Sequence, residues 1–251
     1  EVTGYHFQCW TTQPTGGTTY TNQQVVDIFP AVNNAVVHLY AQWKNNTYYV
    51  DFDANGGTGS MGSQMFTYGV AGTLNPNVFT RVGYTFIGWN TRADGSGTSY
   101  QDLNTVLNLT SVQNGSVTLY AQWRPHTYTV TFERNGAILG RMQPQSFTYD
   151  VPQALSANVF LHREKVFDHW NTAPDDSGTS YTDQEVVSNL SAVDGDTITL
   201  YAQWREKYFA IWIDDSYGGA LYVEPTQCVV GTPVRPAAEA DPGAGGGERS
   251  G

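Results

Sequence analysis

The pentapeptide Leu39-Tyr-Ala-Gln-Trp43 occurs twice more, unchanged, at Leu119–Trp123 and at Leu200–Trp204. Leu39 and Leu119 are 80 residues apart, and Leu119 and Leu200 are 81 residues apart. An identical motif at a nearly constant period is typical of a tandem repeat protein. The pentapeptide therefore divides the chain into modules and favours a structural or surface role over a single catalytic pocket.

Two further motifs recur with the same period and fix the alignment of the repeats. Gly83-Tyr-Thr-Phe-Ile-Gly-Trp89 is matched at Gly4–Trp10 and, more loosely, at Glu164–Trp170. A second set of matching segments comprises Thr47–Phe52, Thr127–Phe132 and, loosely, Lys207–Trp212. Each repeat therefore has a first half, which begins with the Thr-Tyr motif, and a second half, which ends with the pentapeptide.

The order of these motifs predicts two complete repeats flanked by two halves. In chain order, the segments are the C-terminal half of a repeat (1–43), a complete repeat (44–123), a second complete repeat (124–204), the N-terminal half of a repeat (205–234) and a Gly-, Ala- and Pro-rich linker or tail (235–251). A module of about 80 residues buries only a small core, so neighbouring repeats are expected to support one another. A permuted division, with repeats starting near Gly4, Gly83 and Glu164, leaves no orphan halves and stays open.

Strict alternation of apolar and polar residues predicts that most of each repeat is β-strand. In 127–132 the residues Tyr128, Val130 and Phe132 alternate with threonines, which is the pattern of a strand with one buried face. The pentapeptide alternates likewise, so its Leu, Ala and Trp should face the core while its Tyr and Gln face away. Further strands are expected around Tyr84 and Phe86 and around Phe147 and Tyr149.

Two local signals complete the expected secondary structure. Asn55-Gly56-Gly57 predicts a tight turn after the first strand, because glycine adopts positive φ without strain. The stretch from Asp183 to Leu190 is the one expected helix, with Asp183 as its N-cap and Val186, Val187 and Leu190 facing inward.

Composition and charge exclude several classes of protein. The 251 residues are 14% aromatic and 14% charged, and the net charge is −11. An acidic chain of this kind is poorly suited to bind nucleic acid or anionic membranes. No apolar run approaches the roughly 18 residues of a membrane span. The two cysteines, Cys9 and Cys228, are too few for a disulfide framework and are expected to be small buried side chains.

The motifs Thr-Val-Thr-Phe with Asn-Gly, Gly-Tyr-Thr-Phe-x-Gly-Trp and Leu-Tyr-Ala-Gln-Trp resemble the internalin B-type repeat, also called the Listeria–Bacteroides repeat. The resemblance spans residues 1–234 in four pieces and departs from the pattern at Glu164, Lys165, His169 and Cys9. It implies a mainly β fold of tandem α+β modules, each a ubiquitin-like β-grasp of about four strands in an elongated array. It also implies an extracellular, usually bacterial, cell-surface protein or adhesin, and it carries over no catalytic residue.

Residues that commonly perform chemistry do not recur with the repeat. None of the five histidines occupies the same repeat position as another, and no His-x-x-x-His or Cys-x-x-Cys spacing is present. The motif Asp94-Gly-Ser-Gly and the pairs Asp175-Asp176 and Asp214-Asp215 lack the alternating ligands and closing Glu of a calcium loop, so they are interpreted as turns. The sequence therefore predicts no enzyme, no cofactor and no metal site.

The outward tyrosine of the pentapeptide suggests one kind of ligand. Tyr40, Tyr120 and Tyr201 should lie on the sheet face opposite the core, where aromatic rings can stack on sugars. Packing against cross-strand neighbours explains the same positions without a ligand. A surface module that binds a host glycan or host protein is therefore the alternative function.

The two incomplete halves carry the main functional hypothesis. Half a module cannot bury its apolar face alone, so residues 1–43 of one chain are expected to complete residues 205–234 of another. The expected interface residues are Phe209, Ile211, Ile213, Tyr5, Phe7 and Trp10; the first three replace the polar Thr129, Thr131 and Glu133. Such a contact does not close on itself and generates a filament. The predicted function is a non-enzymatic extracellular stalk or filament subunit, and the competing interpretation is an arbitrary piece of a longer array.

Overall fold

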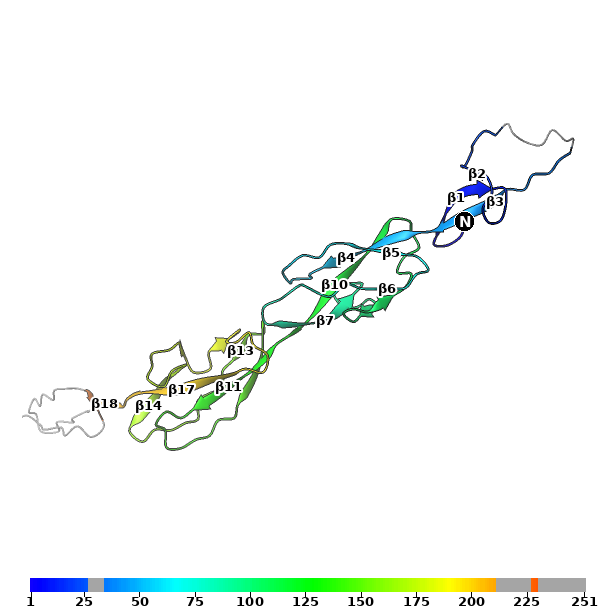
Figure 1. Ribbon diagram of the computed structural model, residues 1–251. Coiled ribbons are helices and arrows are strands. Elements are labelled where there is room, and N and C mark those ends of the chain that lie inside the picture. The colour runs from blue at the N-terminus through cyan, green and yellow to red at the C-terminus, as the bar shows by residue number, and fades with distance from the viewer. Residues whose placement is uncertain (27–33, 211–226, 230–251) are drawn as a thin grey trace, which may run out of the picture. The chain divides into compact units, whose positions relative to one another are not determined.

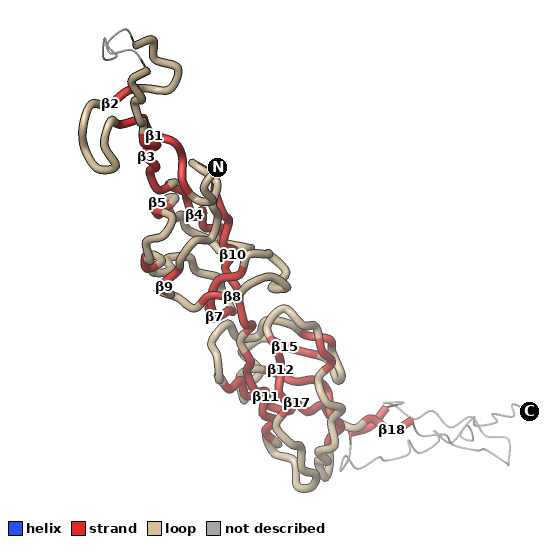
Figure 2. Tube along the Cα trace, turned by 90° about the vertical axis from the view of Figure 1, so that its right-hand side faces the viewer, coloured by secondary structure: helices blue, strands red, loops and turns tan. Residues whose placement is uncertain are grey.

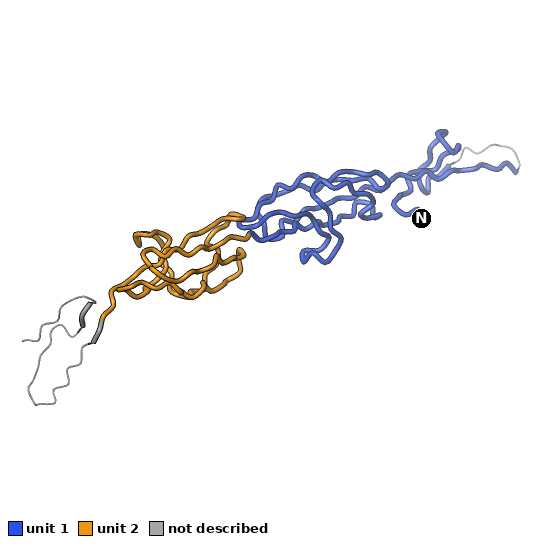
Figure 3. The backbone as a smooth tube through the Cα atoms, turned by 90° about the horizontal axis from the view of Figure 1, so that it is seen from below, with its two compact units in different colours: residues 1–126 blue, residues 127–251 orange. Residues whose placement is uncertain are grey.

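The computed structural model describes residues 1–26, 34–210 and 227–229 as two compact units, residues 1–126 and 127–251 (Figure 3). The described residues form β-strands joined by loops and turns, and none of them is helical (Figure 2). This confirms the expected tandem, mainly β architecture.

The first unit contains a five-stranded sheet in the order β5-β4-β10-β7-β8 (Figure 1). Its strands are β4 (Thr47–Asp53), β5 (Gln64–Thr67), β7 (Tyr84–Asn90), β8 (Ser99–Tyr100) and β10 (Gly115–Pro125). The central strands β4 and β10 are parallel, and the outer pairs are antiparallel. A separate pair, β6 (Gly72–Thr73) with β9 (Thr105–Val106), lies outside this sheet. The first and last strands of the module are therefore neighbours at its centre.

The second unit repeats this arrangement strand for strand. The order is β12-β11-β17-β14-β15, and β11 and β17 form the parallel central pair. The strands are β11 (Thr127–Glu133), β12 (Gln145–Thr148), β14 (Lys165–Asn171), β15 (Ser180–Tyr181) and β17 (Thr197–Glu206), with the small pair β13 (Gln153–Ala154) and β16 (Val186–Val187). The two repeats thus adopt one topology.

Each five-stranded sheet buries its own aromatic core. Trp89 is fully buried, with its ring centroid 4.9 Å from that of Phe52 and 5.0 Å from that of Phe86. Tyr48, Val50, Leu119 and Ala121 from the two central strands complete the core around it. The second unit builds the same arrangement around Trp170. The expected direction of the pentapeptide Leu and Ala is confirmed for the two copies in the five-stranded sheets, where both side chains are fully buried.

The first unit also contains a smaller sheet of three antiparallel strands. It consists of β1 (Tyr5–Thr11), β2 (Thr19–Tyr20) and β3 (Tyr40–Asn45) in the order β2-β1-β3. These strands match β7, β8 and β10 of the five-stranded sheet. In the second unit, β18 (Tyr208–Ala210) pairs with β19 (Gln227–Val229), as β4 pairs with β5.

The expected turn after the first strand is confirmed. Asn55 has φ of 46° and Gly56 has φ of 85°. The N–H of Gly57 donates to the carbonyl oxygen of Ala54 at 2.9 Å, which closes the turn. Asn135 and Gly136 repeat the positive φ values, at 43° and 100°. An asparagine followed by a glycine tolerates this conformation better than most dipeptides.

The expected helix from Asp183 to Leu190 is wrong. Val186 and Val187 form β16, and Gln184 and Asn189 have φ of 58° and 57°, which a right-handed helix does not allow. Asp183 does not cap a helix; its carboxylate accepts the backbone N–H of Asn158 at 2.9 Å. Tertiary contacts therefore override the helical spacing of the apolar residues. The α component of the expected modules is not found in the described residues.

Candidate functional site

The same pentapeptide lies in two different environments. Leu119 and Leu200 are 0% exposed, whereas Leu39 is 38% exposed. The buried copies belong to strands that have a parallel partner, β4 for Leu119 and β11 for Leu200. The N-terminal copy, Leu39–Trp43, lies at the edge of the three-stranded sheet. There β1 is the only described partner of β3. In the described part of the chain, no parallel strand lies beside β3 as β4 lies beside β10, and Leu39 is exposed there.

Residues 35–39, directly before β3, do not form a strand. In the five-stranded sheet, β10 begins at Gly115 and pairs with β4 from that residue onward. The counterpart of Gly115 is Ala35, but β3 begins only at Tyr40. Val36 in the intervening segment is 77% exposed. Since pairing with β4 organises this part of β10, its absence leaves the counterpart in residues 35–39 without regular structure.

The tryptophan of the pentapeptide shows the same difference through a hydrogen bond. The indole N–H of Trp123 donates to the carbonyl oxygen of Ala54 at 2.9 Å, and that of Trp204 donates to the carbonyl oxygen of Arg134 at 3.2 Å. Both acceptors lie in the turn after the first strand of the repeat. Trp43 is 41% exposed, and within the described part of the chain its indole N–H has no acceptor.

An asparagine side chain ties the same turn to the pentapeptide strand. The amide nitrogen of Asn55 donates to the carbonyl oxygens of Ala121 and Ala93 at 2.9 and 2.8 Å. Asn135 donates in the same way to the carbonyl oxygens of Ala202 and Pro174, at 3.0 and 2.8 Å. By alignment, the equivalent carbonyls of the three-stranded sheet belong to Ala41 and Pro14.

The three-stranded sheet has an apolar surface, which we call the open face. It consists of Phe7, Trp10, Leu39, Ala41 and Trp43. The ring centroid of Phe7 lies 5.1 Å from that of Trp10 and 6.1 Å from that of Trp43. Trp10 is only half-buried, whereas its counterparts Trp89 and Trp170 are fully buried. A hollow of about 680 Å³ adjoins Phe7 and Trp43 and extends to Asn46 and Ser111. The open face is thus the half of a repeat core that the first two strands normally cover.

The expected interface residues divide into three groups. Phe7 and Trp10 lie on the open face, and their role in an interface stays a prediction. Tyr5 contacts the neighbouring module instead, with its ring centroid 6.1 Å from that of Tyr68. Phe209 lies in β18, and Ile211 and Ile213 fall outside the described residues. Sequence reasoning missed Leu39 and Trp43, although their identity to Leu119 and Trp123 was the signal that could have found them.

The three-stranded sheet is fixed to the five-stranded sheet that follows it. Asn46 is buried between them, where its side-chain oxygen bonds Nδ1 of His6 at 2.9 Å and its amide nitrogen donates to the carbonyl oxygen of Ser111 at 2.7 Å. Gly4 lies so close to Tyr68 that a Cβ would stand 2.2 Å from the ring. These contacts hold the open face in one orientation within the first unit.

The outward tyrosines lie opposite carboxylates in the parallel register. Tyr120 pairs with Asp53 across β10 and β4, and Tyr201 pairs with Glu133 across β17 and β11. Among the described strands, Tyr40 has a partner only in β1, Thr11, and its side chain is 38% exposed. The parallel register therefore pairs a tyrosine with an acidic residue in each five-stranded sheet.

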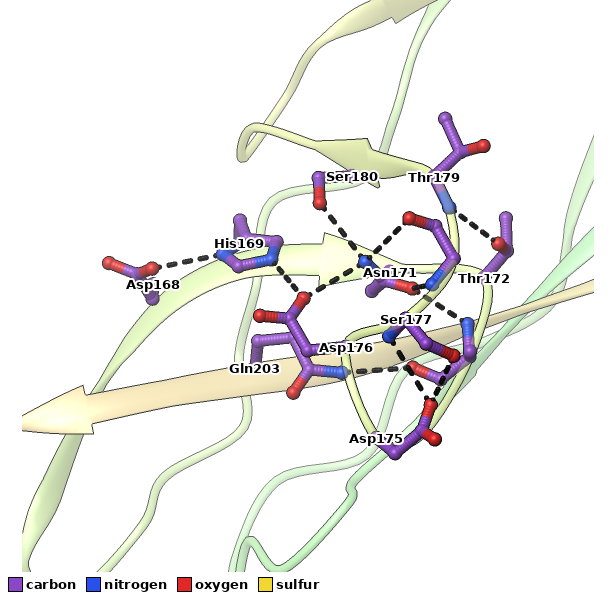
Figure 4. A network of polar contacts seen from close by, with 12 residues as sticks. Asp168, His169, Asn171, Thr172, Asp175, Asp176, Ser177, Thr179, Ser180 and Gln203 are labelled. Atoms are coloured by element: carbon purple, nitrogen blue, oxygen red, sulfur yellow. Dashed lines mark hydrogen bonds and ion pairs between the residues drawn. The ribbon is translucent and has the colours of Figure 1, made fainter.

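One histidine network distinguishes the second repeat from the first (Figure 4). His169 replaces Gly88, and its ring nitrogens bond Asp168 at 2.9 Å and Asp176 at 2.8 Å. Burial alone would lower the pKa of His169, but the hydrogen bonds with Asp168 and Asp176 outweigh it and raise that pKa above the usual value. Asp168 also pairs with Arg205 at 3.2 Å. The network stabilises a charged imidazolium and ties β14 to the loop that follows it.

The other conspicuous aspartates act in turns. The Asp94 carboxylate accepts the backbone N–H and the hydroxyl of Ser96, and these bonds lower the pKa of Asp94. Asp175 and Ser177 repeat this turn in the second unit. Among the described residues, no group of three or more His, Cys, Asp or Glu side chains is arranged to hold a metal ion. In the same residues, no helix has the length and apolar character needed to cross a membrane.

The repeated sheets define a tandem all-β repeat protein, and comparison with known families gives its place among them. The chain belongs to the Listeria-Bacteroides repeat domain family, whose model matches residues 1–42, 48–122 and 128–203. This confirms the resemblance inferred from the motifs.

Two proteins of Evansella cellulosilytica are similar to this chain. One, named "Putative Gly-rich membrane protein", is 38% identical over 144 residues, which are 53% of this chain and 16% of that protein. The other, named "Putative membrane protein", is 32% identical over 168 residues, 66% of this chain and 23% of that protein. The chain thus spans less than a quarter of the length of these relatives. No solved structure matches.

Proposed function

We propose that this chain is a non-enzymatic structural segment of a bacterial cell-surface protein, a stalk or filament subunit that lies outside the cell. The observation that carries this proposal is the burial of the pentapeptide leucine. It is fully buried at Leu119 and Leu200 but exposed at Leu39. A surface that presents apolar residues of a repeat core beside an edge strand is suited to assembly rather than to chemistry. The membrane-protein names of the two relatives support a place at the cell envelope.

The proposed assembly is head to tail. The open face of one copy receives β18 and β19 of another, so that β18 takes the place beside β3 that β4 takes beside β10. Strand addition at an exposed edge provides main-chain hydrogen bonds as well as apolar burial. Because the two contacting surfaces differ, repetition of the contact produces a filament.

This assembly implies particular repeat boundaries and a particular module. The proposed boundaries are 1–43, 44–123, 124–204 and 205–234, since each five-stranded sheet joins the first strand of a repeat to its last. The proposed module is a β-grasp without its helix. The order β5-β4-β10-β7, with the parallel pair β4 and β10 in the centre, supports it.

Light scattering over a concentration series, with electron microscopy of the concentrated protein, tests the proposal. The expected result is a mass that rises with concentration above the 27.6 kDa of one chain, and unbranched filaments. The double variant Phe209→Asp, Ile211→Asp should stay a single chain. A mass of one chain at every concentration, or filaments that persist in the variant, would overturn head-to-tail assembly.

The register of the outward tyrosines favours a second candidate function, adhesion to a host glycan. Tyr120 beside Asp53 offers a stacking surface together with a hydrogen-bond acceptor, the combination that orients a small polar ligand. Glycan-array binding that disappears in Tyr120→Ala or Tyr201→Ala would support it. Binding that survives both substitutions would exclude these tyrosines as the site.

A further inference from the structure

We propose that the first unit contains a binding site for a single uncharged sugar ring. The site is a hollow of about 320 Å³, which we call the glycine hollow, and its lining comes from β7, β8, the loop between them and β10. Gly88 and Gly95 belong to this lining, and His169 and Asp176 take their places in the second unit. The inference goes beyond the structural role proposed above and does not depend on assembly.

The second unit shows what fills the equivalent place (Figure 4). Nε2 of His169 bonds the carboxylate of Asp176 at 2.8 Å, and the same oxygen accepts the side-chain amide of Asn171 at 2.9 Å. In the first unit the equivalent amide, that of Asn90, donates to the main-chain carbonyl oxygen of Gly95 at 3.0 Å. The asparagine therefore holds the loop in both units, whereas the first unit has neither the imidazole nor the carboxylate.

The backbone at Gly88 is suited to an open hollow. Its φ is 136°, and a Cβ there would stand 2.7 Å from the carbonyl oxygen of Tyr100. His169 is not among the residues with positive φ, so the second unit uses a different backbone conformation to hold its ring. Glycine adopts such a φ without strain, and other residues do not. The hollow is therefore part of the fold of the first unit.

One side chain of the lining is fixed before any ligand arrives. Asn90 is 1% exposed. Its amide nitrogen donates to the carbonyl oxygens of Gly95 and Gly97 and to the hydroxyl oxygen of Ser99, at 3.0, 3.2 and 3.0 Å. Its oxygen accepts the backbone N–H groups of Arg92 and Gly97, each at 2.9 Å. A ligand therefore meets a preorganised surface, which reduces the entropic cost of binding.

Three polar groups of the lining are available to a ligand. The side-chain oxygen of Gln122 accepts no hydrogen bond from the described residues, and it lies 3.0 Å from the place that a Cβ of Gly95 would take. The hydroxyl of Ser99 accepts the amide of Asn90, and in this part of the structure its own proton has no acceptor. The exposed side chain of Gln101 makes no hydrogen bond within the described ranges. Together these groups offer both donors and acceptors.

The chemistry of the lining selects the class of ligand. All nine described residues that line the hollow are uncharged, so a charged ligand would lose hydration without meeting a countercharge. Ile87 and Tyr100 add apolar surface to the carboxamides and the hydroxyl. A sugar ring combines hydroxyl groups, which both donate and accept, with C–H groups that pack on apolar surface. The volume lies near the lower end of the roughly 300–1,000 Å³ that is usual for small-molecule sites, which suits one ring.

An NMR titration of the full chain tests the proposal. The probes are the methyl glycosides of glucose, galactose and mannose, and the signals are the backbone amides of Gly88 and Gly95 and the side-chain amide of Gln122. At least one glycoside should shift all three signals, with one ligand per chain and a dissociation constant of about 1 mM, as is usual for a ligand of this size. Methylammonium acetate, which supplies a small cation and a small anion, should leave them unchanged.

Two variants locate the bound ring. Gly95→Asp copies the second unit, where Asp176 has φ of 65° against 78° for Gly95, so the backbone accepts the new side chain. The carboxylate would occupy the hollow beside Gln122 and should weaken binding at least about tenfold. Gln122→Ala removes the free oxygen and should weaken it by a similar factor. Gln203→Ala is the matched control in the second unit and should change nothing.

The possible results decide between this site and the others. Absence of shifts with every glycoside at about ten times 1 mM, or equal shifts with methylammonium acetate, would overturn the proposal. Undiminished binding by Gly95→Asp or by Gln122→Ala would also overturn it, and the indole signal of Trp89 reports whether each variant keeps its core. Tyr120 is not among the described residues of the lining, so Tyr120→Ala should still bind. Loss of binding in that variant would assign the sugar to the outward tyrosine instead.

Discussion

The indole N–H of Trp123 donates to the carbonyl oxygen of Ala54, 69 residues earlier in the chain, at 2.9 Å. This bond joins the last strand of the repeat to the turn after its first strand. It shows which contact the identical Trp43 lacks. The environment of the pentapeptide therefore depends on the first strand of the repeat and the turn after it, which lie far from the pentapeptide in the sequence.

Trp123→Phe should destabilise the first unit, because it removes this hydrogen bond while most of the ring packing against Phe86 is kept. The expected loss in free energy of unfolding is about 1 kcal/mol. Denaturant unfolding followed by circular dichroism measures it. Trp43→Phe is the matched control and should leave stability unchanged in dilute protein, since its N–H has no acceptor among the described residues. A similar loss in both variants would contradict the assignment.

Truncation of the pentapeptide leucine should have unequal effects in the different copies. Leu119→Ala and Leu200→Ala each remove a fully buried side chain and should cost about 2–5 kcal/mol. Leu39→Ala removes a side chain that is 38% exposed and should cost well under about 2 kcal/mol. Thermal unfolding of the three variants under the same conditions provides the comparison. Equal costs would mean that Leu39 is buried in solution.

His169 should make the second unit more stable at low pH. Its pKa is raised in the folded state, so the folded state binds the proton more tightly than the unfolded chain. The stabilisation is fully present below the unfolded pKa of about 6.5 and is lost as pH rises through the higher folded pKa. Unfolding measured between about pH 5 and pH 8 should show this decline.

His169→Gln is the control for the pH effect, because it keeps a polar side chain between Asp168 and Asp176 but cannot gain a charge in this range. Its unfolding free energy should lack the decline above pH 6.5 that the raised pKa produces. A variant whose pH dependence matches that of the natural chain would show that another group titrates there.

The strands were predictable because their signal is local. Alternation in Thr127–Phe132 and in the pentapeptide depends only on which face of one strand is buried, and both segments form the expected strands. The expected helix at Asp183–Leu190 failed for the opposite reason. Pairing of Val186 and Val187 with β13 is a contact between distant parts of the chain, and helical spacing of apolar residues contains no information about it.

The candidate site was only partly predictable. The idea of an incomplete module pointed to Phe7 and Trp10, whose role in an interface stays a prediction. Trp43 and Leu39 did not, because identical residues were assumed to have identical surroundings. Burial of the pentapeptide depends on β4 and β11, some 70 residues earlier, and the turns that follow these strands contribute the carbonyl and the asparagine amide. The surroundings of the copy at Leu39–Trp43 therefore could not be predicted from its own sequence.

Amide hydrogen exchange of Leu39–Trp43, compared with Leu119–Trp123 in the same dilute chain, tests the open face most directly. Local protection reports how often each segment is open. The predicted result for the dilute chain is fast exchange at Leu39–Trp43 and slow exchange at Leu119–Trp123. Equally slow exchange of the two segments in the dilute chain would show that the face is already covered.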